Sequence, residues 1–169
     1  SGFLRQYLLL WREFCRQKSP VARPRSIRAV EISCAFPPSP DTVAHIREAE
    51  ALGYRRAWLY DSPSLYGDVW MVLALAATAT DRIGLGTAVL VPNLRHPLVQ
   101  ASAIATLEQR APGRAAIAIG TGFTGRMAMG QPALRWAWVR DYIAQLRALL
   151  RGEQVEVDGA MVQMLHAPE

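Results

Sequence analysis

Polar and small side chains follow four apolar runs of the sequence, and these are the residues whose types could do chemistry. The candidate binding residues lie at or just after the ends of such runs: Asp61, Ser62, Thr87, Ala88, Val89, Gly120, Thr121 and Gly122. Glycine lets backbone N–H groups approach a ligand closely, and carboxylate and hydroxyl groups can hydrogen-bond to it. The pattern therefore favours a site for a planar ring or a phosphate.

Each of these motifs, taken singly, is weak evidence for a binding site. The glycine loop 120–125 has neither the lysine of a P-loop nor the spacing of a dinucleotide fingerprint, so it is equally typical of a strand-to-loop turn. Asp61 on its own is more typical of a capping or structural carboxylate. The sequence identifies no catalytic residue.

The three histidines differ in position. His96 stands beside Arg95 before an expected helix start and is the only histidine near the candidate site, whereas His45 and His166 fit solvated or core positions. The two cysteines, Cys15 and Cys34, are too few for a disulfide framework or a cysteine-rich zinc site. We therefore expect no metal site, and a reducing, cytoplasmic location.

Short apolar runs alternate with amphipathic stretches along most of the chain, which predicts β/α units and a parallel sheet. The strands are expected over residues 29–36, 56–60, 83–91 and 114–119. The helices are expected over residues 42–52, 68–80, 97–109 and 135–150, and a hairpin over residues 153–165. Active sites of such α/β folds form at the C-terminal ends of the strands, where the candidate residues lie.

The basic character of the chain is confined to its beginning. Residues 1–31 hold seven Arg or Lys and two Glu residues, which accounts for the whole net charge of +5. The remainder is neutral, so a basic face for nucleic acid is not expected. We expect residues 1–28 to be a basic leader, a non-homologous extension or a helix, and residues 29–169 to form the domain. No run approaches the ~18 apolar residues of a membrane span, so no membrane partner is expected.

The ordered series of motifs resembles the bacterial luciferase-like monooxygenase superfamily, and most closely its coenzyme F-420-dependent branch, typified by methylenetetrahydromethanopterin reductase. The motifs are residues 58–62, 81–87, 95–97, 107–108, 112–114 and 119–122. The resemblance covers about residues 29–166. It implies an α/β fold that is the N-terminal half of a (β/α)₈ TIM barrel, with four parallel β/α units in sequential order. A whole barrel usually takes ~250 residues, so we expect a truncated one.

The resemblance also implies a site. In the family, a non-prolyl cis peptide after the third strand supports the back face of the cofactor ring, and the matching bond is Ala88-Val89. Asp61 matches an aspartate near the ring, and Thr121 and Gly122 match the loop that lines the cofactor site.

Two departures from the family bear on the reaction. The alcohol- and sugar-phosphate-oxidising enzymes have a histidine where this chain has Ser62, and the sugar-phosphate enzymes have a glutamate where it has Phe123. Hydride transfer to an already electrophilic substrate needs neither group, so the resemblance favours a reductase.

We therefore predict an oxidoreductase that transfers a hydride between the deazaflavin coenzyme F-420 and a small organic substrate. An FMN-dependent monooxygenase and a non-catalytic truncated fragment are the alternatives. The sequence leaves the substrate and the oligomeric state open, a homo-oligomer included.

Overall fold

A computed structural model describes residues 30–167 of the chain. The expected leader at residues 1–28 and the expected domain start at residue 29 lie outside the described residues. The expected hairpin, at 153–165, lies within them.

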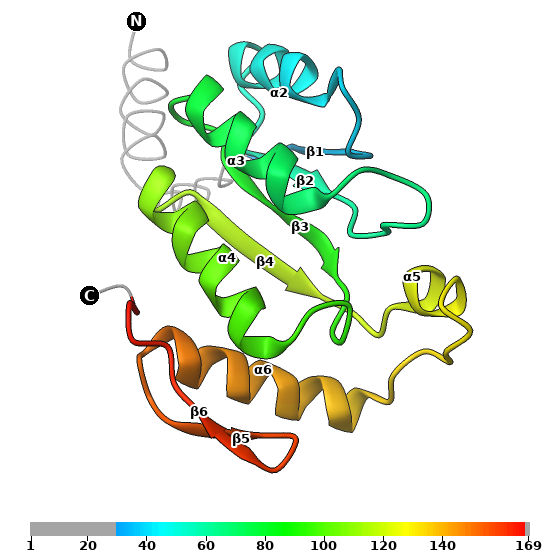
Figure 1. Ribbon diagram of the computed structural model, residues 1–169. Helices are drawn as coiled ribbons and strands as arrows, with labels where there is room; N and C mark the ends of the chain where they lie inside the picture. The colour runs from blue at the N-terminus through cyan, green and yellow to red at the C-terminus, as the bar shows by residue number, and fades with distance from the viewer. Residues whose placement is uncertain (1–29, 168–169) are drawn as a thin grey trace, which may run out of the picture. The chain divides into compact units, whose positions relative to one another are not determined.

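Four parallel strands form one sheet in the order of the sequence, as predicted (Figure 1). They are β1 (Ser33–Phe36), β2 (Arg56–Leu59), β3 (Gly84–Leu90) and β4 (Ala115–Ile119). The first strand is shorter than expected, because β1 has a neighbour only in β2 and pairs with it only from Ser33 to Phe36. Residues 30–32 therefore lie outside the sheet.

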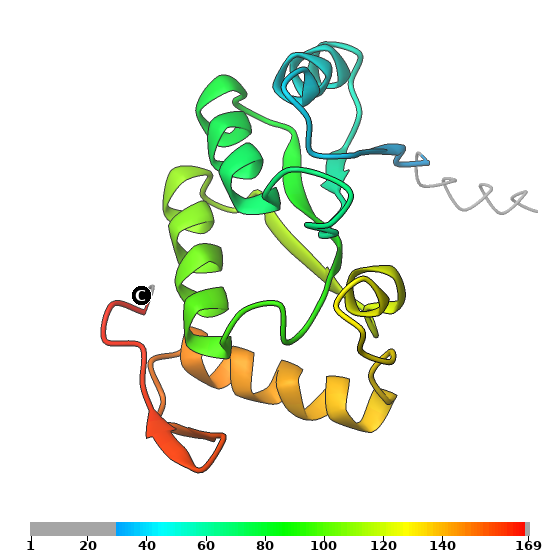
Figure 2. The same ribbon diagram turned by 45° about the vertical axis from the view of Figure 1, so that its right-hand side comes forward.

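Three helices connect the strands, and a fourth follows the sheet. They are α2 (Thr42–Ala51), α3 (Val69–Ala79), α4 (Pro97–Arg110) and α6 (Trp136–Leu150). Figures 1 and 2 show α3 and α4 side by side against one face of the sheet, with α6 crossing the end of α4. Two helix boundaries carry residues that favour them: Gly53 follows α2 in a left-handed conformation, and Pro97 is the first residue of α4.

One element was not predicted. A short helix, α5 (Phe123–Met127), follows β4, and its five residues are too few to give a helical pattern in the sequence. The hairpin is confirmed, with β5 (Val155–Val157) and β6 (Ala160–Val162) pairing antiparallel.

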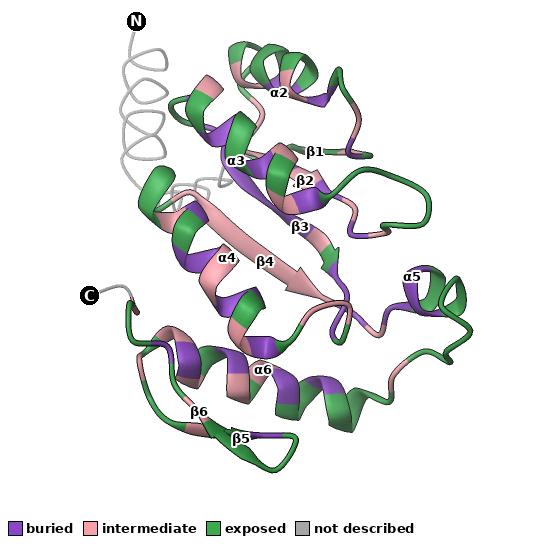
Figure 3. Cartoon of the chain, viewed as in Figure 1, coloured by how far each residue is buried: buried purple, intermediate pink, exposed green. Residues whose placement is uncertain are grey.

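The buried core lies between the sheet and its helices (Figure 3). One cluster joins α2, α3 and the first three strands, with Ile46, Leu59 and Leu73 fully buried. A second cluster joins β3, α4 and α6, with Leu90 and Leu149 fully buried. β4 is only partly buried along its whole length.

Within the described part of the chain, no helix is both long and apolar enough to cross a membrane.

Candidate functional site

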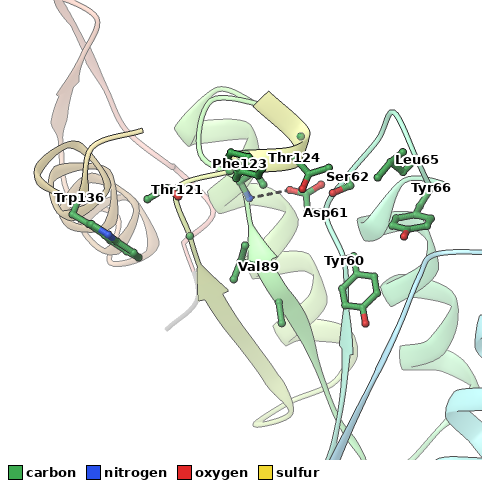
Figure 4. A pocket seen from close by; sticks show the side chains of 15 residues that line it. Tyr60, Asp61, Ser62, Leu65, Tyr66, Val89, Thr121, Phe123, Thr124 and Trp136 are labelled. Carbon is green, nitrogen blue, oxygen red and sulfur yellow. Dashed lines mark hydrogen bonds between the residues drawn. The ribbon is translucent and has the colours of Figure 1, made fainter. Parts of the chain in front are cut away.

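A pocket of about 460 Å³ opens at the C-terminal ends of β2, β3 and β4 (Figure 4). The residues that line it come from these strand ends, the loops after them and the start of α6: Tyr60, Asp61, Ser62, Leu65, Tyr66, Ala88, Val89, Val91, Gly120, Thr121, Gly122, Phe123, Thr124, Gly125 and Trp136. The volume falls within the ~300–1,000 Å³ that is usual for ligand pockets. The strand ends converge as a parallel sheet requires.

The structure brings seven of the eight candidate residues to this pocket: Asp61, Ser62, Ala88, Val89, Gly120, Thr121 and Gly122. Thr87 is the exception and is fully buried. Side chains alternate along a strand, so Thr87 and its neighbour Ala88 point to opposite faces of the sheet. The Thr87 hydroxyl has no hydrogen-bond partner among the described residues.

The floor of the pocket is the end of β3. The peptide bond Ala88-Val89 is cis, as the family resemblance predicted. The pairing of β3 with β4 shifts register between Ala88 and Leu90. Val89 is 41% exposed, and its side chain projects into the pocket in Figure 4. The floor is therefore apolar and accessible.

The glycine loop after β4 approaches this floor closely. A Cβ atom on Gly120 would lie 2.8 Å from Val89 Cγ2, a contact that real Cβ atoms do not make. Gly122 has φ of +75°, and a Cβ there would collide with Val91 Cγ1. Both positions therefore require glycine if the pocket is to keep its shape.

Asp61 belongs to the lining, but its carboxylate is buried and already has hydrogen-bond partners. The side chain is only 1% exposed, and both carboxylate oxygens accept hydrogen bonds from Arg95 Nη1, at 3.0 and 3.1 Å. The backbone N–H of Val91 donates to the same carboxylate at 3.3 Å. Burial raises the pKa of Asp61, and the facing Arg95 guanidinium offsets only part of this rise.

The residues beside Asp61 have structural roles as well. Arg95 Nη2 donates to Asp68 Oδ2 at 2.8 Å, so one guanidinium binds two carboxylates. His96, the candidate ligand contact, instead caps α4: its Nδ1 accepts from the backbone N–H of Leu98 at 3.2 Å. Its side chain is not among those that line the pocket.

Sequence reasoning missed the aromatic walls of the pocket. Tyr60 and Tyr66 lie on one side, with ring centroids 6.0 Å apart, and Trp136 lies on the other (Figure 4). Phe123 belongs to the unpredicted helix α5 and is also exposed here. For Tyr60 and Tyr66 the signal available in the sequence was their position just after a strand end, where functional residues are common, but this position does not place them in a pocket. Trp136 begins α6, and nothing in the sequence indicated that it would reach the site.

The floor at Val89 and the aromatic walls give the pocket an apolar surface of the kind that suits a flat apolar ring, and Ser62 and Thr121 add hydroxyl groups to the lining. Across residues 30–167, no group of three or more His, Cys, Asp or Glu side chains could hold a metal ion.

Together, the fold and the pocket define an α/β protein with the architecture of half a TIM barrel and a ligand site at its C-terminal strand ends. The chain belongs to the luciferase-like monooxygenase family, whose sequence profile matches residues 7–169.

Two curated relatives illustrate this membership. An F-420-dependent glucose-6-phosphate dehydrogenase of Beutenbergia cavernae is 45% identical over 93 residues, which are 52% of this chain and 28% of the relative. A 5,10-methylenetetrahydromethanopterin reductase of Methanopyrus kandleri is 44% identical over 84 residues, covering 49% of this chain and 24% of the relative.

The structure is similar to that of the coenzyme F-420-dependent tetrahydromethanopterin reductase from Methanopyrus kandleri. The TM-score is 0.69 at 28% identity, and the match covers 80% of this chain and 45% of that one. The chain thus spans less than half the length of the relatives that it matches. The two curated relatives are oxidoreductases by name, which supports an oxidoreductase family.

Proposed function

We propose that this chain contributes the cofactor pocket of a coenzyme F-420-dependent oxidoreductase that reduces a small organic electrophile. The observation that carries the proposal is the pocket itself, with Val89 exposed in its floor and the loop from Gly120 to Gly122 closing one side. The names of the relatives that are 45% and 44% identical support F-420 as the cofactor.

The residues of the chain would bind and orient the cofactor, and the deazaflavin, when bound, supplies the hydride. Ala88 and Val89 would support the back face of the ring, because they form the accessible floor. Gly120 would keep Val89 in its place in the floor, because a Cβ on Gly120 would collide with the Val89 side chain. Ser62 and Thr121 would hydrogen-bond to polar edges of the ring, since both line the pocket.

The lining also supports a reductase rather than an alcohol-oxidising enzyme. It includes no histidine, lysine or arginine among the described residues, and its one carboxylate, Asp61, is bound to Arg95. Ser62 and Phe123 stand where the oxidising relatives have acid or base groups. Hydride transfer to a substrate that is already electrophilic needs none of these groups, so it is the reaction that this lining fits best.

Cofactor titration tests the proposal. The full-length protein is titrated with F-420 and, separately, with FMN, and binding is followed by fluorescence. We expect micromolar binding of F-420. Micromolar binding of FMN with none of F-420 would instead assign the pocket to a flavin-dependent monooxygenase.

Substitution of the pocket floor localises the site. Ala88→Phe places a bulky ring where the cofactor would lie, so it should reduce F-420 binding below detection while the protein stays folded. The matched control is Ala160→Phe, because Ala160 is exposed on the hairpin. Wild-type affinity in the Ala88→Phe protein would place the cofactor elsewhere.

A further inference from the structure

One wall of the pocket is a loop whose two ends meet the same side chain. The segment between β2 and α3 carries Ser62, Leu65 and Tyr66 of the lining. Asp61 stands at its beginning and Asp68 at its end, and both carboxylates bind the guanidinium of Arg95. The contact distances are 3.0 Å from Nη1 to Asp61 Oδ1 and 2.8 Å from Nη2 to Asp68 Oδ2.

The loop between these two ends has little other support. Leu65 and Tyr66 donate backbone hydrogen bonds to Ser62 O, at 2.9 and 3.0 Å, and Gly67 donates to Pro38 O at 3.2 Å. The residues from 63 to 68 are exposed. A segment with few buried contacts depends on its anchors for a fixed position.

Asp61 of this ion pair also contacts a second part of the pocket lining, the residue Val91 after β3. Asp61 Oδ2 accepts a hydrogen bond from the backbone N–H of Val91, and Val91 lies against the position where a Gly122 Cβ would be. Arg95 thus stands at the junction of the loops after β2 and β3.

Of the basic side chains, only arginine can bind both carboxylates in this way. The guanidinium is a planar fork that can bind two carboxylates at once, whereas the ammonium group of lysine is a single point of charge. The Arg95 side chain is 17% exposed and that of Asp61 is 1% exposed, so the pair is desolvated. Buried ion pairs are weak contributors to stability but impose a defined geometry.

We propose that Arg95 is a positioning residue of the cofactor pocket: by holding both ends of the 61–68 loop, it fixes Ser62 and Tyr66 relative to the floor at Val89. The inference rests on the proposed function, since it assigns the loop a part in holding the cofactor.

The experiment compares two variants of the full-length protein with the wild type. Arg95→Lys keeps the positive charge and loses the fork. The double variant Asp61→Asn with Arg95→Gln removes the pair without leaving a buried charge alone. The control is Arg151→Gln, which breaks the exposed pair of Arg151 with Glu153 away from the pocket. Each protein is measured for thermal unfolding, F-420 binding and amide hydrogen exchange.

We expect both Arg95 variants to raise the Kd for F-420 by roughly ten- to a hundredfold, because small misplacements of binding groups are costly. Amide exchange should become faster in residues 62–67 and stay unchanged in β3 and β4. Arg151→Gln should match the wild type in its Kd for F-420 and in its amide exchange.

Two results would overturn the inference: wild-type binding and exchange in the Arg95 variants, or exchange that accelerates equally across the sheet, which is the mark of a purely structural role. If the wild type binds no F-420, the proposed function fails, and the exchange data alone then decide whether Arg95 anchors the loop. Unchanged exchange in residues 62–67 would refute the anchor, and local acceleration there would support it.

Discussion

Gly122 combines a left-handed backbone with a close neighbour at the rim of the pocket. Its φ is +75°, and a Cβ would collide with Val91. Gly122→Ala should lower the free energy of unfolding by about 1–3 kcal/mol from the backbone conformation alone, with a further loss from the collision. It should also weaken F-420 binding, because Val91 and Gly122 both line the pocket.

Gly113→Ala is the matched control for this prediction. Gly113 has φ of +70° and no atom within 4 Å of a Cβ, so it shares the backbone cost without the collision. Denaturant unfolding and cofactor titration of both variants separate the two effects. Equal losses of stability in both variants, with unchanged binding, would contradict the close packing inferred at Gly122.

Glu50 predicts a pH dependence of stability. Its carboxylate accepts three backbone hydrogen bonds, from the N–H groups of Asp81, Arg82 and Ile83, at 3.0, 2.6 and 2.8 Å. Burial raises the pKa of Glu50, but these N–H groups and the charge of Arg82 lower it more, so the net shift is downward from 4.5. A lowered carboxyl pKa stabilises the fold above the unfolded pKa, and this stabilisation is lost as pH falls through the folded one.

Glu50→Gln should therefore cost about 1 kcal/mol near pH 7, a modest value because the carboxylate is partly exposed. The difference from the wild type should shrink as pH falls below about 4.5. Urea unfolding of both proteins between pH 3 and pH 7 measures it. A difference that is constant over this range would rule out the ionised carboxylate as the acceptor.

At the scale of elements, α2 and α3 differ in whether a side chain accepts hydrogen bonds from the free backbone N–H groups of the first turn. Asp68 caps α3, because its Oδ1 accepts from Trp70 N at 2.8 Å and Met71 N at 3.1 Å. Asp41 stands at the same position before α2 but makes no such bond. The residue type is identical, and only the local geometry differs.

Asp68→Ala should therefore lower the free energy of unfolding by about 0.5–2 kcal/mol, while Asp41→Ala should have little effect. Asp68→Asn keeps a capping oxygen but loses the charge that faces Arg95, so it separates the cap from the ion pair. Thermal unfolding of the three variants measures the order of their stabilities. Equal destabilisation by Asp68→Ala and Asp41→Ala would show that the cap contributes nothing.

For the molecule as a whole, the two buried clusters share a residue. Trp70 on α3 packs against both, so the described domain should unfold as one unit. Leu73→Ala should cost about 2–5 kcal/mol, because Leu73 is fully buried in the first cluster. Leu75→Ala on the same helix is the control, since Leu75 is 59% exposed.

Far- and near-ultraviolet circular dichroism of the Leu73→Ala protein should report a single transition at a lower temperature. Two separate transitions would mean that the clusters unfold independently. The Leu75→Ala protein should unfold within a few degrees of the wild type.

Much of this fold follows from the sequence by itself. The alternation of apolar runs with helical patterns predicted a parallel sheet of four strands, because each strand and its crossover helix form a local unit, and the family resemblance implied their sequential order. Gly53 after α2 and Pro97 at the start of α4 lie at helix boundaries, where these residue types are favoured. The convergence of strand ends at one pocket follows from the same topology.

The tertiary structure alone decided how the side chains at that pocket are used. Asp61 and Arg95 are 34 positions apart in sequence, and their pairing depends on the register of β2 and β3 and on the path of two loops. The placement of Tyr66 and Trp136 on opposite sides of one pocket depends on the same packing. Local patterns specify elements, whereas contacts between residues distant in sequence are fixed only when the sheet and its helices pack together.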